Sequence, residues 1–247
     1  MKKNILGLYI SVASYKQAIE QVVGLAIKKM PAYVCFANVH MLVEARQDKA
    51  FSQVVNGATF TFADGKPLAF AMQKLYGIKQ ERVAGMDFMP SILEKCQEQQ
   101  LAVFFYGSTD LILAEINTTI QQRFPDLQVA GMISPPFRPL TEAEQQADIQ
   151  QINASGAHMV LVSLGCPKQE NWMFTHSKKI NAVLLGVGGA FPVFAGLQSR
   201  APEWWQKMSL EWLYRLFQEP KRLGGRYFKT NTIFIALLLQ ALLNKKN

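Results

Sequence analysis

The sequence contains few of the residues that bind metal ions or form disulfides. Three cysteines and three histidines occur among its 247 residues. Cys35, Cys96 and Cys166 are too scattered for a disulfide framework or a zinc site, and so few cysteines favour a reducing compartment. The Asp-x-Asp motif, which often holds a divalent cation, is absent. We therefore predict neither a bound metal nor a cofactor.

Long hydrophobic runs are also absent. No window reaches the roughly 18–20 apolar residues that cross a bilayer. The N-terminal apolar stretch is interrupted by polar residues within about ten positions, which predicts a mature cytoplasmic start rather than a signal peptide. The last apolar run, Thr232 to Leu243, is long enough to lie in a membrane surface or to dock on a partner.

Acidic residues are scarce towards the C-terminus. The net charge is +8, from 26 Lys and Arg against 18 Asp and Glu. Residues 1–198 hold 17 against 15, whereas residues 199–247 hold 9 against 3 and also contain Trp204, Trp205 and Trp212. Basic residues mixed with aromatic ones suit a membrane surface or a nucleic acid. A solvated C-terminal helix is the alternative.

Apolar residues, by contrast, make up 49% of the chain, and this share predicts a folded core. Short apolar runs, typical of buried parallel strands, alternate with segments of 3.6-residue periodicity. This alternation predicts an α/β fold, and the composition changes near residues 198–202. The predicted strands are 33–37, 59–63, 102–106, 127–132, 159–164 and 182–187, and the predicted helices are 41–55, 66–76, 87–100, 110–124, 141–154 and 168–179.

Ligands of such sheets bind at the carboxyl ends of the strands. Three glycine-containing turns at this edge lead into helices, where backbone N–H groups can bind phosphate. We therefore expect Gly107, Ser108, Gly165 and Gly188 to contact a nucleotide. None of these turns is a Walker A loop, and Gly186-Val187-Gly188 matches a dinucleotide fingerprint only in part.

Several side chains near the same edge could carry chemistry. Asp64 follows a predicted strand and could be a general base, or it could cap the turn before Gly-Lys-Pro. Arg82 could bind an anionic substrate or lie on the surface, and Gln169 could contact sugar hydroxyls or cover a helix surface. We expect His40 to satisfy a loop carbonyl and Cys166 to be a small buried thiol.

Six segments, in their order along the chain, resemble the WecG/TagA/CpsF glycosyltransferase family. They are Asn38-Val39-His40, Ala63-Asp64-Gly65-Lys66-Pro67, Glu81-Arg82-Val83-Ala84-Gly85-Met86-Asp87, Gly165-Cys166-Pro167-Lys168-Gln169-Glu170, Arg200-Ala201-Pro202-Glu203-Trp204, and Glu211-Trp212-Leu213-Tyr214-Arg215 with Glu219-Pro220-Lys221-Arg222. The resemblance implies a Rossmann-like, mostly parallel α/β sheet with helices on both faces as a UDP-sugar-binding catalytic core over residues 1–198. It also implies a helical, membrane-associating C-terminal appendage over residues 199–247.

The function implied by the resemblance is an inverting, metal-independent hexosyltransferase. Such enzymes move a sugar of the N-acetylmannosamine, N-acetylmannosaminuronate or hexose type from a UDP-sugar to a sugar on a polyprenyl diphosphate. Their products enter teichoic acid and other cell-surface polysaccharides. The implied partners are the UDP-sugar donor, the lipid-linked acceptor and the inner membrane surface, with peripheral association from the cytoplasm. A homo-oligomer is compatible with the apolar tail, and no nucleic acid is expected.

Roles for individual residues follow from the same motifs. Asp64 is implied to be the catalytic base, which takes the proton from the acceptor hydroxyl. Asn38 and Gln169 are implied contacts of the donor sugar, and Arg82 an implied substrate-positioning residue.

The appendage is implied to supply arginines that hold the diphosphate in place of a metal, because guanidinium groups bind phosphate oxygens in pairs. These residues are Arg215, Arg222 and Arg226. Two positions depart from the family pattern: Phe36 stands where threonine is frequent, and Pro192 where aspartate is frequent.

Other classes of function remain open. A non-catalytic protein that binds UDP or another diphosphate at the membrane surface would keep the glycine turns but would not depend on Asp64. A nucleic-acid-binding protein would use the basic, aromatic tail and bind with a steep salt dependence. A nicotinamide oxidoreductase fits the alternation of strands and helices but not the glycine spacing.

Overall fold

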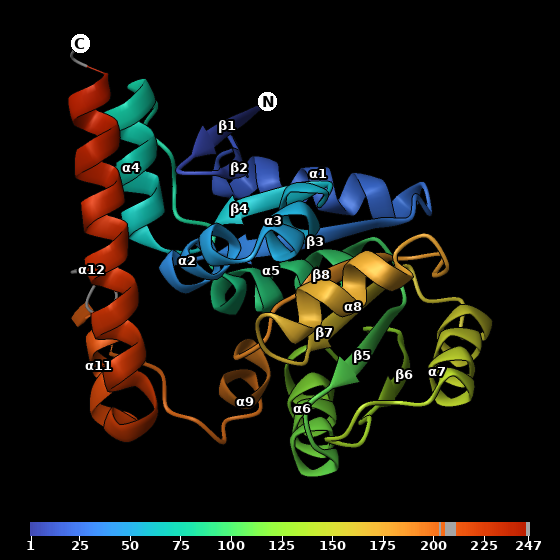
Figure 1. The fold of residues 1–247 in the computed structure, drawn as a ribbon. Coiled ribbons are helices and arrows are strands. Elements are labelled where there is room, and N and C mark those ends of the chain that lie inside the picture. Colours follow the sequence, from blue (N-terminus) through green and yellow to red (C-terminus); the bar gives the residue numbers. More distant parts are fainter. Residues whose placement is uncertain (203, 206–210, 246–247) are drawn as a thin grey trace.

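The structure is a computed structural model that describes residues 1–202, 204–205 and 211–245, except the side chains of Arg215 and Arg222. Its centre is a six-stranded parallel sheet with the strand order β4-β3-β8-β7-β5-β6 (Figure 1). The strands are β3 (Ala32–Ala37), β4 (Phe60–Ala63), β5 (Val103–Gly107), β6 (Val129–Ile133), β7 (Met159–Ser163) and β8 (Val183–Gly186). All six predicted strands are confirmed, and their ends differ by at most two residues.

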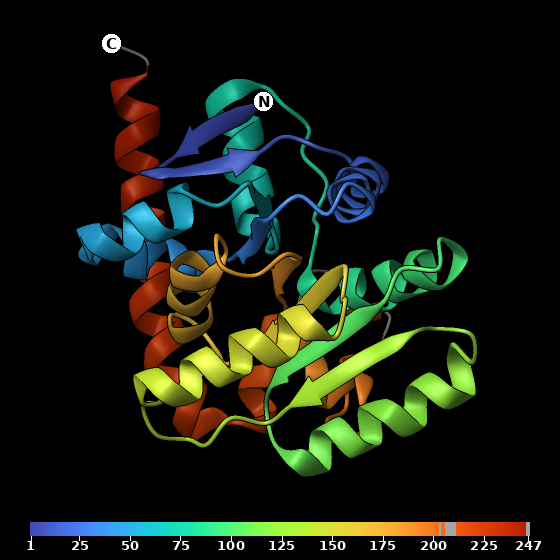
Figure 2. The same cartoon turned by 90° about the vertical axis from the view of Figure 1, so that its right-hand side faces the viewer.

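Helices cover both faces of the sheet, as the fold prediction required (Figures 1 and 2). One face packs against α1 (Tyr15–Ile27), α5 (Gly85–Glu98), α6 (Asp110–Arg123) and α9 (Ala190–Phe194). The other packs against α2 (Val39–Gln47), α3 (Lys49–Asn56), α4 (Lys66–Tyr76), α7 (Glu142–Ala154) and α8 (Lys168–His176). Strands buried on both faces explain why their sequences are continuously apolar.

Two features at the N-terminal side differ from the predicted elements. The helix predicted over 41–55 is two helices, because Asp48 is the C-cap of α2 and the N-cap of α3. Its carboxylate accepts hydrogen bonds from the N–H groups of Ala50 and Phe51 in the first turn of α3. The first residues, for which no strand was predicted, form a hairpin of β1 (Lys2–Ile5) and β2 (Leu8–Ser11) before α1. These four-residue strands are too short for their alternation to stand out in the sequence.

The C-terminal segment adds α11 (Glu211–Gln218) and α12 (Pro220–Asn244), which pack on each other. α12 runs beside α2 and α4 (Figure 1), and its Phe234 and Leu238 are buried in the same hydrophobic cluster as those helices. The division at residue 198 remains a prediction. Within the described ranges, no helix is both long and apolar enough to cross a bilayer.

Candidate active site

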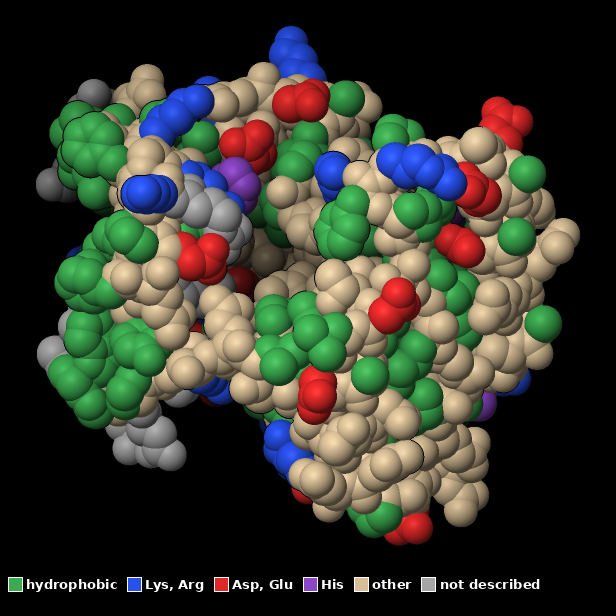
Figure 3. All heavy atoms as spheres, turned by 90° about the horizontal axis from the view of Figure 1, so that it is seen from below, with side chains coloured by type: hydrophobic (Ala, Val, Ile, Leu, Met, Phe, Trp, Pro, Cys, Tyr) green, Lys and Arg blue, Asp and Glu red, His purple; other side chains and the backbone are tan. Residues whose placement is uncertain are grey.

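The residues that follow β3 and β4 lie together at the carboxyl edge of the sheet. Ala37 pairs with Ala63 at the ends of these strands, so Asn38 and Asp64 are neighbours, and the Asp64 N–H donates to the Ala37 carbonyl at 2.8 Å. Seen from below, the molecule is hollowed between the core and the appendage that carries α11 and α12 (Figure 3). These residues thus lie at the edge of the sheet where the sequence predicts ligand binding.

Asp64 is not the cap of the helix that follows it. The N-cap of α4 is Gly65, which makes no side-chain capping bond, and Pro67 lies in the first turn. The carboxylate is half-buried, and its backbone is held by the bond to β3. Asp64 is therefore not the N-cap of α4, and it lies half-buried at the edge of the sheet, where a general base was predicted.

The amide oxygen of Asn38 caps a helix. It is the N-cap of α2, and its Oδ1 accepts a hydrogen bond from the Met41 N–H at 3.1 Å. This bond fixes the χ angles of the side chain and leaves the amide nitrogen as the group that can donate to a ligand.

Gln169 and Glu170, at the start of α8, are buried beneath the end of β8. Gln169 Nε2 donates to the Gly186 carbonyl at 3.1 Å and to Glu170 Oε1 at 2.6 Å. Gln169 Oε1 and Glu170 Oε2 have no hydrogen-bond partner among the described residues. Burial raises the pKa of Glu170, although the Gln169 hydrogen bond opposes the shift. The surface alternative for Gln169 is wrong, and Glu170 is a buried acid to which the sequence patterns assigned no role.

In two of the glycine-containing turns, backbone N–H groups that were expected to bind phosphate are hydrogen-bonded within the protein. The Ser108 N–H donates to the Ser163 carbonyl at 2.9 Å, and the Gly188 N–H donates to the Val162 carbonyl at 3.1 Å. Gly107 has φ +110°, and its Cα lies against the Ser163 backbone, where a side chain would collide. These N–H groups are thus already paired, so the Ser108 hydroxyl is the group that remains for a ligand.

Gly165, with φ +77°, begins the turn to α8, and an added Cβ would meet open space there. A pocket of about 350 Å³ opens beside this turn, on the side of α7 and α8. Its base is aromatic, because Tyr106 and Trp172 stack with their centroids 4.3 Å apart. Polar groups that surround this base include Ser108, Ser163, Gln145, Lys168 and Asn171. A planar ring with polar substituents fits such a pocket, and the sequence patterns did not single out Trp172.

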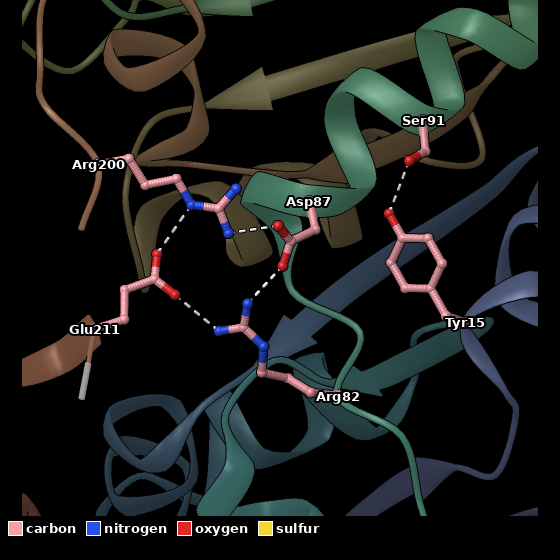
Figure 4. A network of polar contacts seen from close by, with 6 residues as sticks. All are labelled: Tyr15, Arg82, Asp87, Ser91, Arg200 and Glu211. Carbon is pink, nitrogen blue, oxygen red and sulfur yellow. Dashed lines mark hydrogen bonds and ion pairs between the residues drawn. The ribbon is translucent and has the colours of Figure 1, made fainter. Parts of the chain in front are cut away.

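Arg82 is engaged at both ends of its guanidinium group (Figure 4). Nη2 lies 2.5 Å from Asp87 Oδ2, and Nη1 lies 2.8 Å from Glu211 Oε2 in the appendage. Burial works against the Arg82 charge, but the Glu211 hydrogen bond and the charges of Asp87, Glu211 and Asp64 outweigh it and raise the pKa. The structure thus brings Arg82 to the Asp64 edge and pairs it there with carboxylates.

Arg226 on α12 lies close to His40 of the core. Its positive charge adds to burial in lowering the pKa of His40, whose Nδ1 is 3.6 Å from Glu44 Oε1 and makes no hydrogen bond to a described residue. Arg226 Nε is buried and also finds no acceptor there. Arg215 and Arg222 lie on α11 and α12, but their side chains fall outside the described part of the structure.

Three further positions behave as structural residues. Phe36 is buried in the core and packs on Phe62 and Phe88. Pro192 lies within α9, and its carbonyl accepts from Leu197. Cys166 is half-buried rather than fully buried, and burial raises the pKa of its thiol, which argues against a nucleophile. Among the described residues, no three His, Cys, Asp or Glu side chains converge as a metal site.

Comparison with known proteins identifies a family and two similar enzymes. A model of the glycosyl transferase WecG/TagA/CpsF family matches residues 3–247. An N-acetylglucosaminyldiphosphoundecaprenol N-acetyl-beta-D-mannosaminyltransferase of Bacillus spizizenii (strain ATCC 23059 / NRRL B-14472 / W23) is 32% identical over 192 residues, which cover 77% of this chain and 73% of the relative. A protein of the same name from Staphylococcus aureus (strain MW2) is 28% identical over 210 residues, with 85% and 80% covered. The chain belongs to the glycosyl transferase WecG/TagA/CpsF family.

Proposed function

We propose that this glycosyltransferase moves an N-acetylmannosamine-type sugar from UDP to N-acetylglucosamine on a polyprenyl diphosphate, with inversion and without a metal ion. The names of both relatives support this donor and acceptor chemistry. The observation that carries the proposal is the placement of Asp64: it directly follows β4, lies beside Asn38 at the carboxyl edge of the sheet, and is not the N-cap of α4.

The reaction is a single displacement at the anomeric carbon. Asp64 takes the proton of the acceptor hydroxyl while that oxygen forms the new glycosidic bond on the face opposite UDP. The bond between the anomeric carbon and the UDP oxygen breaks, and the electron pair leaves with UDP. Inversion follows because one displacement occurs.

The donor is held along the carboxyl edge. The uracil and ribose occupy the pocket lined by Ser108 and Trp172, next to Gly165. The sugar then reaches the Asn38 amide nitrogen and the Gln169 Oε1 at Gly188, which are polar groups with hydrogen-bonding capacity to spare. A ligand there would satisfy the buried Gln169 oxygen, which is costly to leave unpaired.

Charge on the leaving diphosphate is neutralised by arginines of the appendage. Arg226 already lies near His40 at this edge, with an Nε that has no hydrogen-bond partner among the described residues, and Arg215 and Arg222 are on the same pair of helices. Bidentate guanidinium contacts stabilise a diphosphate strongly without a metal ion. The absence of Asp-x-Asp from the sequence agrees with this arrangement.

The outer side of α12 binds the cytoplasmic face of the membrane that holds the acceptor. Phe228, Ile235, Leu239 and Leu243 are exposed at spacings of seven, four and four residues, so they form one stripe opposite the buried Phe234. Figure 3 shows hydrophobic side chains gathered on the left, over α11 and α12, with Lys and Arg beside them. An apolar stripe bordered by cations suits an anionic lipid surface.

The test is to incubate the protein with UDP-N-acetylmannosamine and a short-chain polyprenyl diphosphate-N-acetylglucosamine, with and without EDTA. We expect UDP release that requires the acceptor, a product one N-acetylhexosamine heavier by mass spectrometry, and no loss with EDTA. UDP binding in a calorimeter without any transfer, across a panel of UDP-sugars, would contradict the proposal and favour a non-catalytic diphosphate binder. Loss of transfer with EDTA that Mg²⁺ restores would overturn its metal-independent part.

A further inference from the structure

Four charged side chains form a closed ring between the core and the appendage. Arg82 and Arg200 alternate with Asp87 and Glu211, and each carboxylate oxygen binds a different guanidinium nitrogen (Figure 4). Arg200 Nη2 contacts Asp87 Oδ1, and its Nε lies 3.4 Å from Glu211 Oε1. Every charge in the ring thus has an opposite charge on both sides.

A backbone hydrogen bond connects the loop that carries Arg82 to the strand end that carries Asp64. The N–H of Val83, next to Arg82, donates to the Ala63 carbonyl at 2.8 Å, and Ala63 precedes Asp64. Gln80, two residues before Arg82, is fixed to Ala13 through its side chain. The loop at Arg82 is therefore rigidly placed, and what the ring determines is the direction of the guanidinium group.

Half of the ring comes from the C-terminal part of the chain. Glu211 begins α11, 129 residues after Arg82, and Arg200 follows α9, 113 residues after Asp87. The Glu211 side chain is only 10% exposed, whereas the other three are 23–32% exposed. Without a docked α11, Arg82 would keep only the Asp87 contact and its Nη1 would turn to solvent.

We propose that Glu211, together with Arg200 and Asp87, positions Arg82 beside Asp64, so that the direction of the Arg82 guanidinium group, and with it the rate of transfer, depends on this ring of four charges. The inference rests on the proposed transferase function and adds three positioning residues to it. The requirement persists for an acceptor that needs no membrane, because the ring acts on the edge of the sheet and not on lipid.

The test compares Glu211→Gln with wild type on a short-chain, water-soluble acceptor without vesicles. Glutamine keeps the shape of the side chain but removes the charge that Arg82 and Arg200 share. We expect kcat to fall at least tenfold, while the Kd for UDP stays within about twofold, because the nucleotide pocket lies elsewhere. Glu98→Gln is the matched control, since it removes an exposed carboxylate from the Lys95 pair on α5 and leaves kcat unchanged.

Two further measurements separate positioning from folding. Arg200→Gln should also lower kcat, and the double variant with Glu211→Gln should be little worse than either alone, because both act on the same Arg82. Glu211→Asp, which restores the carboxylate, should recover part of the rate. Wild-type kcat in Glu211→Gln, or fully additive losses, would overturn the inference. If wild type itself transfers nothing, the proposed function fails instead.

Discussion

The Gln169 amide oxygen lies against Gly188, so closely that a Cβ on the glycine would stand 3.1 Å from it. Gly188 has φ +47°, and its N–H is bonded to β7. The turn after β8 is therefore fixed next to Gln169, and the absence of a side chain at Gly188 leaves room for the buried Gln169 oxygen, which has no hydrogen-bond partner among the described residues.

Gly188→Ala should impair the donor site more than it impairs the fold. The new methyl group displaces Gln169, so we expect KM for the UDP-sugar to rise about tenfold. Gly156→Ala is the control, because Gly156 has φ +72° and an added Cβ there would meet no atom within 4 Å. Alanine at this position carries the same backbone strain of roughly 1 kcal/mol but does not contact the site. Equal KM values in steady-state kinetics of the two variants would contradict the role of Gln169.

Glu170 should make stability depend on pH. Its folded pKa is raised by burial, so its favourable contribution is complete below the unfolded pKa and is lost as the pH rises through the folded pKa. Glu170→Gln removes this loss. We expect urea unfolding to show that the free energy of unfolding of the variant rises relative to that of wild type by roughly 1.4 kcal/mol for each pH unit between those two pKa values. The control Glu98→Gln should show the same pH dependence of the free energy of unfolding as wild type. If Glu170→Gln also shows the wild-type pH dependence, Glu170 does not have a raised pKa in the folded protein.

The pocket beside Trp172 should close when its rim is filled. Thr175 lines the pocket on the exposed side of α8, and a tryptophan there would occupy the space proposed for the nucleotide. We expect Thr175→Trp to weaken UDP binding at least about tenfold in calorimetry. Lys178→Trp, exposed two residues beyond the end of α8, adds the same ring away from the pocket and should bind UDP normally. Unchanged affinity in Thr175→Trp would place the nucleotide elsewhere.

Charges on the outer stripe of α12 should release the protein from lipid. Ile235→Glu with Leu239→Glu puts two carboxylates where the apolar face would enter the membrane surface, so co-sedimentation with anionic vesicles should fall at least about tenfold. The control, Gln240→Glu with Asn244→Glu, adds the same charge beside the stripe and measures only the repulsion between the added carboxylates and the anionic lipids. If both pairs reduce binding equally, the apolar stripe is not the contact.

The sheet was predictable because buried parallel strands leave a local signal, namely continuous apolar runs such as residues 159–164 and 182–187. The position of Asp64 followed from the same signal, since it comes directly after a strand. The partners of Arg82 did not, because Glu211 lies 129 residues away and no local pattern encodes that pairing. Glu170 was missed for a related reason: its burial depends on β8 and α8 meeting, which only the folded chain shows.

The most direct test of the proposed chemistry is the rate of Asp64→Asn in a single turnover with saturating donor and short-chain acceptor. Asparagine keeps the size of the side chain but cannot accept the proton of the acceptor hydroxyl. We expect the rate of sugar transfer to fall by about 10²–10⁴, with the Kd for UDP within about twofold of wild type. Transfer at the wild-type rate would show that Asp64 is not the base and would contradict the proposed mechanism.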